Sequence, residues 1–234
     1  MKRRRLLLMR HGAVEYFDAT GQPIRDPLAV SLTAAGEAQA RSMGAAIASA
    51  GVPIDRVITS GLVRTRQTAA LVLEAAGISP PVEHRSALEE IRAGHLGGIA
   101  RNELRDAFLA AFAGPVDENV RFLNGETVGA LLTRVLSALD SILKDDHWDT
   151  LLLVAHGGVN RALLSWFLTG RRQLLGGIEQ APGCLNIVDV GATPADSLVR
   201  VVNYSPMDAL QMVGRQSTME HLLGQYLKFR NNDT

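Results

Sequence analysis

Two histidines in this chain directly follow short apolar runs, and a glycine follows each of them. Arg10-His11-Gly12 comes after Leu6–Met9, and His156-Gly157-Gly158 comes after Thr150–Ala155. A neutral imidazole can act as a nucleophile or carry a proton, and the planar fork of an arginine matches phosphate oxygens. Two such histidines at equivalent positions favour a functional site. The alternative is a pair of buried histidines satisfied by backbone partners.

Two further segments add an anion site and a pair of acids. Thr59–Ala69 follows another apolar run and opens a predicted helix, with Arg64 within a turn of its beginning. The free amides of a first helical turn attract anions. Glu89 and Glu90 stand beside a glycine-rich turn. Taken alone, this acidic pair is typical of a solvent-exposed surface.

The elements that must position these residues alternate between strands and helices. The clearest buried strand is predicted at Thr150–Ala155, and helical periodicity is strongest between Val128 and Leu143. Such alternation predicts an α/β fold, a three-layer α/β/α sandwich with a mostly parallel central sheet. Ligands bind at the carboxyl ends of the strands in such sheets, so both histidine-glycine turns should lie at that edge.

We expect a single domain over residues 1–234, with a small cap-like insertion at about 92–124 and a helical tail at about 205–234. The insertion contains a predicted short helix near Glu103–Phe112. In the tail, Ser217 and Glu220 have the spacing of a capping box. The apolar side of the helix that follows leaves two arrangements open: packing on the domain, or packing on the second subunit of a homodimer.

The composition excludes several classes of protein. The 24 basic and 24 acidic residues give no formal net charge, and therefore no general attraction to nucleic acid or to anionic membranes. Hydrophobic residues make up 47% of the chain, too many for a disordered protein, and Cys184 alone cannot form an internal disulfide. The apolar run Leu6–Met9 is shorter than the roughly 7–15 residues of a signal peptide. We therefore expect a cytoplasmic protein with no nucleic-acid or membrane partner.

Four motifs together carry a family resemblance. They are Arg-His-Gly at 10–12, Ser-x-Leu-x-Arg-x-x-x-Thr-Ala at 60–69, Leu-x-Glu at 88–90 with glycines downstream, and Ala-His-Gly-Gly at 155–158. Subsidiary matches are Leu32-Thr33-x-x-Gly36-x-x-Gln39-Ala40 and Gly125-Glu126-Thr127. In order and spacing, from Leu6 to about Asn203, the chain resembles the histidine phosphatase (phosphoglycerate mutase-like) superfamily.

The resemblance implies a role for each matched residue. His11 is similar to the nucleophile that becomes phosphorylated. Three residues match those that hold the phosphoryl group: Arg10, Arg64 and His156. Glu90 matches the general acid/base, with Glu89 as the fallback if that turn is shifted by one residue. His11 must present one free ring nitrogen, so we expect a hydrogen bond, for example to a nearby backbone carbonyl, to hold the other.

No metal or other cofactor is expected. The chain has no two histidines four residues apart, no His-Glu-x-x-His and no Cys-x-x-Cys. Arginines beside the histidines would also repel a cation. The resemblance implies a small phosphorylated metabolite as substrate: a sugar phosphate, a phosphoglycerate, a ribazole phosphate or another small monoester. The candidates for contact with its leaving group, each equally compatible with an exposed position, are Glu15, Tyr16, Arg25 and Arg101.

Three functions remain open. The favoured one is a metal-independent phosphatase that hydrolyses small phosphate monoesters through a covalent phosphohistidine. The alternative is phosphoglycerate mutase-type phosphoryl transfer. The cofactor-dependent mutases of the family carry Glu-Ser and then Trp-Asn after Arg-His-Gly, where this chain has Ala13–Phe17, and a longer middle insertion than residues 92–124. The second alternative is a non-catalytic phosphate-binding scaffold, which the presence of all the matched site residues disfavours.

Overall fold

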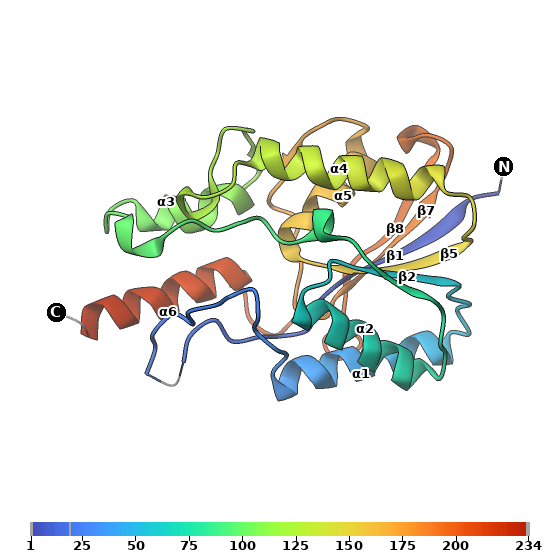
Figure 1. Ribbon diagram of the computed structural model, residues 1–234, viewed down its shortest axis with the longest axis horizontal. Coiled ribbons are helices and arrows are strands. Elements are labelled where there is room, and N and C mark those ends of the chain that lie inside the picture. Colours follow the sequence, from blue (N-terminus) through green and yellow to red (C-terminus); the bar gives the residue numbers. More distant parts are fainter. Residues whose placement is uncertain (1, 19, 233–234) are drawn as a thin grey trace.

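In the computed structural model, which describes residues 2–18 and 20–232, a six-stranded sheet carries helices on both faces (Figure 1). The strands are β1 (Arg4–Arg10), β2 (Arg56–Thr59), β3 (Val82–His84), β4 (Pro115–Val116), β5 (Thr150–Ala155), β6 (Leu174–Leu175), β7 (Leu185–Val190) and β8 (Leu198–Tyr204). The α-helices are α1 (Ala34–Ser49), α2 (Val63–Ala76), α3 (Leu104–Leu109), α4 (Val128–Lys144), α5 (Gly157–Thr169) and α6 (Thr218–Asn232). Short 3₁₀ helices, η1 (Ser86–Leu88), η2 (Leu96–Gly98), η3 (Ala110–Phe112), η4 (Phe122–Asn124) and η5 (Pro194–Asp196), lie in the connections.

The main sheet has the strand order β3-β2-β5-β1-β7-β8. Strand β7 runs antiparallel to both of its neighbours, and the other strands share one direction. The predicted α/β/α sandwich with a mostly parallel sheet is therefore confirmed. In the register of the sheet, Arg10 stands beside Ala155 and Thr59 beside Val154. Strands β1, β2 and β5 thus end at one edge, as the motif positions require.

Strand β1 is buried on both faces, in two separate clusters of apolar side chains. Leu6 and Leu8 pack in the cluster under α4 and α5, whereas Leu7 and Met9 pack in the cluster under α1 and α2. Each of these four side chains is at most 1% exposed. Burial on both faces explains why this strand reads as a continuous apolar run rather than as an alternating pattern. The strand that leads into His11 is fixed from both sides of the sheet.

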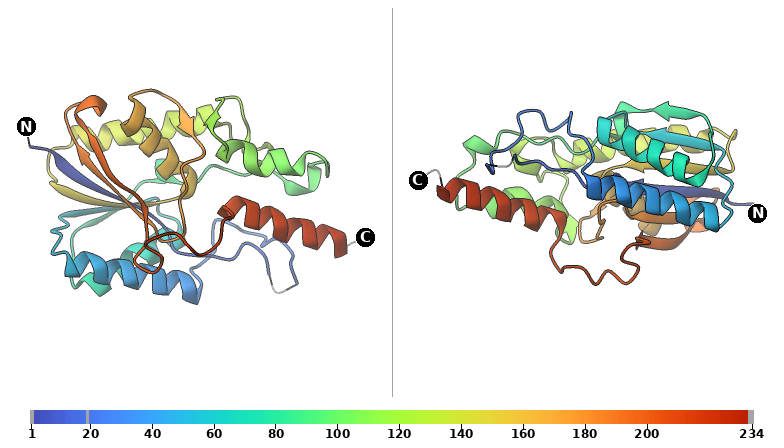
Figure 2. Two further views of the ribbon diagram at one scale, coloured as in Figure 1. Left: turned by 180° about the vertical axis from the view of Figure 1, so that it is seen from behind. Right: turned by 90° about the horizontal axis from the view of Figure 1, so that it is seen from below.

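The insertion and the tail lie together beyond the carboxyl edge of the sheet. Within 92–124 the chain forms η2, α3, η3, β4 and η4. Strand β4 pairs with β6 in a small two-stranded sheet that the sequence did not predict. Helix α6 lies along α3 (Figure 2), and the Tyr226 ring contacts Phe17 and Phe108, with centroids 6.5 and 5.9 Å away. Its apolar side therefore packs on its own chain.

The predicted boundary of α6 is also confirmed. Glu220 Oε2 accepts from the Ser217 amide at 2.7 Å, and Ser217 Oγ accepts from the Glu220 amide at 3.3 Å, which is a capping box. The last two residues of the predicted tail, 233 and 234, lie outside the described residues. Among the helices within 2–18 and 20–232, none combines the length and apolarity needed to cross a membrane.

Candidate active site

His11 leaves β1 as a buried, neutral imidazole, 3% exposed. Its Nδ1 lies 2.7 Å from the carbonyl oxygen of Gly12. A carbonyl can only accept, so Nδ1 carries the proton and Nε2 keeps its lone pair. The expected hydrogen bond to a backbone carbonyl is therefore present. Burial holds the pKa of His11 well below its usual value, and the charges of Arg10 and Arg64 lower it further.

Gly12 is required by backbone packing. A Cβ at Gly12 would lie 2.4 Å from the carbonyl oxygen of Gly36, in the first turn of α1, and a Cβ at Gly36 would lie 2.2 Å from that of Ala13. Two side chains complete the contact: Gly12 N donates to Thr68 Oγ1 at 3.1 Å, and Ala13 N donates to Gln39 Oε1 at 2.8 Å. Residues of two separate motifs thus hold the turn that carries the nucleophile candidate.

Arg10 and Arg64 are both held through one terminal nitrogen. Arg10 Nη1 donates to the Gln180 carbonyl at 2.5 Å and to Thr218 Oγ1 at 2.8 Å. Arg64 Nη1 donates to the Pro27 carbonyl at 3.2 Å. The Nε atoms of both arginines are buried and have no hydrogen-bond partner. Each guanidinium therefore keeps its Nε side available for an anion.

His156 ends a chain of hydroxyl groups that fixes its tautomer. Thr65 Oγ1 donates its single hydrogen to the Leu62 carbonyl at 2.8 Å, so Ser60 Oγ donates to Thr65 Oγ1 across 3.0 Å. Ser60 Oγ then accepts from His156 Nε2 at 2.8 Å. Burial, followed by the neighbouring positively charged groups, holds the pKa of His156 well below its usual value. His156 Nδ1 is left buried without a partner.

The side chains of Arg10, His11, Arg64 and His156 lie around one buried site. The rings of His11 and His156 are 5.1 Å apart, and the charges of both arginines reach both histidines. Across residues 2–18 and 20–232, the buried side-chain nitrogens and oxygens without a partner are Arg10 Nε, Arg64 Nε and His156 Nδ1. Buried polar groups are almost always paired in proteins. Such a cluster of unpaired nitrogens therefore fits an anion with several oxygens.

Of the two acids, Glu90 is the one that reaches this place. Its two carboxylate oxygens each accept from Gly158 N at 3.1 Å, at the beginning of α5 and two residues after His156. A Cβ at Gly158 would lie 2.6 Å from Glu90 Oε1, so the second glycine of His-Gly-Gly makes room for this carboxylate. The Glu89 carboxylate instead lies 3.8 Å from Arg92. The structure thus brings Arg10, His11, Arg64, Glu90 and His156 together.

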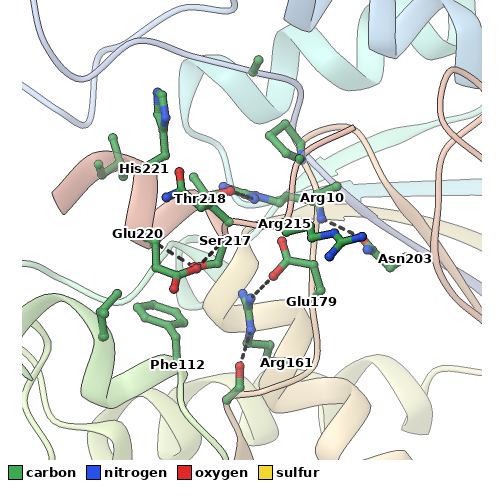
Figure 3. A pocket seen from close by; sticks show the side chains of 18 of the residues that line it. Arg10, Phe112, Arg161, Glu179, Asn203, Arg215, Ser217, Thr218, Glu220 and His221 are labelled. Carbon is green, nitrogen blue, oxygen red and sulfur yellow. Dashed lines mark hydrogen bonds and ion pairs between the residues drawn. The ribbon is translucent and has the colours of Figure 1, made fainter. Parts of the chain in front are cut away.

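Arg10 and His11 line a pocket of about 1340 Å³. Figure 3 shows Arg10 in this pocket with Phe112, Arg161 and Thr218. The walls of the pocket come from residues 13–16, from the insertion at 109–113, and from residues 211–225 around the start of α6. Of the leaving-group candidates, Glu15 and Tyr16 line this pocket, whereas Arg25 and Arg101 do not. Burial raises the pKa of Tyr16, while the charges of Arg64 and Arg10 act against that rise. Tyr16 therefore stands between the open pocket and the buried anion site.

Two polar residues of the site escaped the sequence analysis. Arg161, on α5, donates from Nε to the Gly176 carbonyl at 2.9 Å and reaches Glu179 at 3.4 Å, beside the ring of Phe112 (Figure 3). The signal for it in the sequence is a single charged residue in the stretch 157–169, which has no other charged side chain. Thr218, at the start of α6, contacts Arg10 across 208 positions of sequence. No local pattern indicates such a contact.

Comparisons with known proteins give the family and the fold of this chain. Residues 6–201 match the family described as the histidine phosphatase superfamily (branch 1). Over 174 residues the chain is 35% identical to a 2,3-bisphosphoglycerate-dependent phosphoglycerate mutase of Methylobacterium radiotolerans, covering 69% of this chain and 77% of the relative. It is 30% identical over 181 residues to a broad-specificity phosphatase of Saccharomyces cerevisiae, covering 69% of each. The structure of the α-ribazole phosphatase of Shigella flexneri has the same fold, with a TM-score of 0.64, 23% identity, and coverage of 85% of this chain and 96% of that one.

Proposed function

Because the chain belongs to the histidine phosphatase superfamily, a family whose members carry out phosphoryl hydrolysis or transfer, we propose that it is a phosphatase acting on small phosphate monoesters. The observation that carries this proposal is the cluster of buried, unpartnered nitrogens on Arg10, Arg64 and His156 around a neutral His11. A phosphate monoester is doubly charged, and its transfer depends on positioning and on neutralising the equatorial oxygens. The two guanidiniums supply donors for those oxygens without a metal.

The proposed reaction has two steps. His11 Nε2 attacks phosphorus in line, the bond to the ester oxygen breaks, and Glu90 gives its proton to the departing alkoxide. Water then attacks the phosphohistidine, Glu90 takes a proton from that water, and the N–P bond breaks to release phosphate and regenerate His11. His156 contributes a donor once a bound dianion draws a proton onto Nδ1. The P–N bond formed in the first step is broken in the second, and the proton that Glu90 gives up is returned to it by water. The proton that His156 takes up comes from solvent as the dianion binds.

Mutase-type transfer is the second candidate, because a relative 35% identical to the chain is a phosphoglycerate mutase. A mutase must keep its phosphorylated intermediate bound while that molecule changes its orientation in the site. The pocket beside His11 is large and open to solvent, which instead admits water. This difference supports hydrolysis as the main reaction.

The test is hydrolysis of p-nitrophenyl phosphate by the wild type and by His11→Ala, each with and without EDTA. We expect hydrolysis by the wild type in both conditions and loss of about 10³-fold or more in the variant, because the covalent step is removed. Full activity of His11→Ala would overturn the phosphohistidine mechanism, and loss on chelation would point to a metal. A second assay supplies the enzyme with a phosphoglycerate and measures both its isomerisation and the phosphate released. Isomerisation faster than phosphate release would favour the mutase. Phosphate binding without turnover of any monoester would favour the scaffold.

A further inference from the structure

We propose that Arg134 is a positioning residue for the proton donor, acting through the backbone of the segment 87–92, here called the acid loop. This inference rests on the proposed function, since it gives Glu90 the role of acid. Arg134 lies on α4, more than forty positions from Glu90 in sequence, and its side chain is only 15% exposed. None of the hydrogen bonds of Arg134 goes to the unpaired nitrogens of the anion site or to a residue that lines the pocket. Its charge helps to lower the pKa of His156, but it holds the proton donor only through the backbone, so its effect on Glu90 is indirect.

All five N–H donors of the Arg134 guanidinium have acceptors. Nε and Nη2 each donate to a carboxylate oxygen of Glu126 at 2.8 Å. Nη1 donates to the carbonyl oxygens of Ala87 and Glu89 at 2.9 and 2.6 Å, and Nη2 also donates to that of Glu90 at 3.0 Å. Three carbonyls of the acid loop thus converge on one planar group. Arginine is the side chain that supplies five donors in a fixed plane.

Glu126 ties the same loop from its other end. Besides pairing with Arg134, its Oε2 accepts from the Arg92 amide at 2.9 Å, and its own amide donates to the Arg92 carbonyl at 2.8 Å. Gly125 allows this approach, because a Cβ there would lie 2.3 Å from the Arg92 carbonyl oxygen. Arg134 therefore anchors the acid loop before Glu90 and Glu126 anchors it after Glu90, while Thr127 caps α4.

This anchoring matters because Glu90 belongs to no helix or strand. Its carboxylate reaches α5 only if its backbone stays at the distance that the Arg134 fork sets. A displacement of about 1 Å in a reacting group can cost 10²-fold in rate. Loss of the fork should therefore impair proton donation to the leaving group while leaving His11 and the phosphoryl contacts in place.

The experiment compares two esters that differ in their need for an acid. An alkyl monoester such as β-glycerophosphate expels a poor leaving group and depends on proton donation, whereas 2,4-dinitrophenyl phosphate does not. For Arg134→Lys, which keeps the charge but offers three donors and no fork, we expect kcat/KM for the alkyl ester to fall about 10²-fold. The aryl ester should lose less than about threefold, and Glu90→Gln should show the same pattern more strongly.

Arg172→Lys is the matched control. Arg172 also forms a two-point contact with a carboxylate, Glu118, at 2.9 Å and also bonds a carbonyl of α4, that of Gly129, but it does not touch the acid loop. It should change neither ester by more than about twofold. If Arg134→Lys does not fold, Glu126→Gln tests the same anchor, and urea unfolding reports which case applies.

The outcomes separate the inference from the proposed function. Equal losses on both esters, or no loss on either, would overturn the positioning role even though His11→Ala stays inactive. Undiminished hydrolysis by His11→Ala would instead overturn the proposed mechanism. A wild type that hydrolyses neither ester would overturn both.

Discussion

His11 and His156 are both buried and neutral, but they hold their protons on opposite ring nitrogens. In His11 the Gly12 carbonyl keeps the proton on Nδ1, and in His156 the hydroxyl of Ser60 keeps it on Nε2. The first arrangement leaves Nε2 free to attack, and the second leaves Nδ1 free to take up a proton when an anion arrives. Two residues of one type thus receive different roles from the single hydrogen bond each one makes.

The burial of His156 predicts how stability depends on pH. In the folded chain the pKa of His156 is well below the ordinary value of 6.5. As pH falls below 6.5, His156 is therefore protonated in the unfolded chain while it is still neutral in the folded chain. The contribution of His156 to the free energy of unfolding is therefore fully present above its pKa in the unfolded chain. It is lost as pH falls towards its pKa in the folded chain, by up to about 1.4 kcal/mol per pH unit for one histidine. Urea unfolding of the wild type and of His156→Gln between pH 7.5 and about 5 measures this.

We expect the free energy of unfolding to fall less steeply with decreasing pH in the variant. His147 works in the opposite direction, because its hydrogen bond to Asp145 raises its pKa, but it is the same in both proteins and cancels in the comparison. Identical slopes for the two proteins would show that His156 is not buried as a neutral group.

At the scale of elements, the edge where β1, β2 and β5 end is assembled by contacts between turns and helix beginnings. The turn after β1 lies backbone to backbone on the first turn of α1, and the carboxylate of Glu90 lies on the first turn of α5. In both places a glycine provides the space. These glycines are needed because of what they touch, since neither Gly36 nor Gly158 has a positive φ.

Gly36→Ala tests the first of these contacts. Its Cβ would lie 2.2 Å from the Ala13 carbonyl oxygen, so α1 or the turn after His11 must move. We expect a loss of about 1–3 kcal/mol of stability from overpacking, together with a lower kcat on p-nitrophenyl phosphate. Thermal unfolding and steady-state kinetics check both.

Gly224→Ala is the control for this substitution. Gly224 is also helical, but a Cβ there meets nothing within 4 Å. Alanine should stabilise that position by about 0.5–1 kcal/mol, because glycine costs conformational entropy in a helix. If Gly36→Ala behaved like this control, the backbone contact between α1 and the turn would not be real.

The elements themselves could largely be predicted from the sequence, because each is encoded locally. The apolar run Leu6–Met9 specifies the middle of β1, and the periodicity that starts at Val128 specifies both α4 and its beginning. The partners of buried polar side chains could not be predicted in this way. Arg134 looks like an ordinary solvated residue of α4, and only the packing of residues 87–90 beside it shows that its donors are used.

At the scale of the molecule, the walls of the pocket come from segments near opposite ends of the described chain. Tyr226 of α6 stands where they meet, and its ring contacts Phe17 in the first long loop and Phe108 in the insertion. The N-terminal end of the same helix places Thr218 on Arg10. Helix α6 thus links the first long loop and the insertion to the anion site.

Tyr226→Ala should remove the contacts of α6 with both the first long loop and the insertion. The side chain is 4% exposed, and loss of a buried aromatic ring costs about 3–5 kcal/mol. We expect a lower urea midpoint and a higher KM for monoesters with bulky alcohols, whose contacts lie in the pocket. Tyr204→Ala, at an exposed position of β8, should change stability by less than about 0.5 kcal/mol. Equal midpoints for the two variants would contradict the linking role of α6.

His11 and Glu90 are held by different kinds of structure, and this difference predicts how much each of them moves. His11 continues a strand that is paired on both sides and buried on both faces, whereas Glu90 sits on an irregular segment tethered by side chains. Fluctuations large enough to break contacts start where such regular pairing is absent. Amide hydrogens of β1 should therefore exchange with solvent far more slowly than those of residues 89–93. His11 then keeps its position during turnover. For esters that need a proton donor, the rate of turnover depends on how often Glu90 is in place.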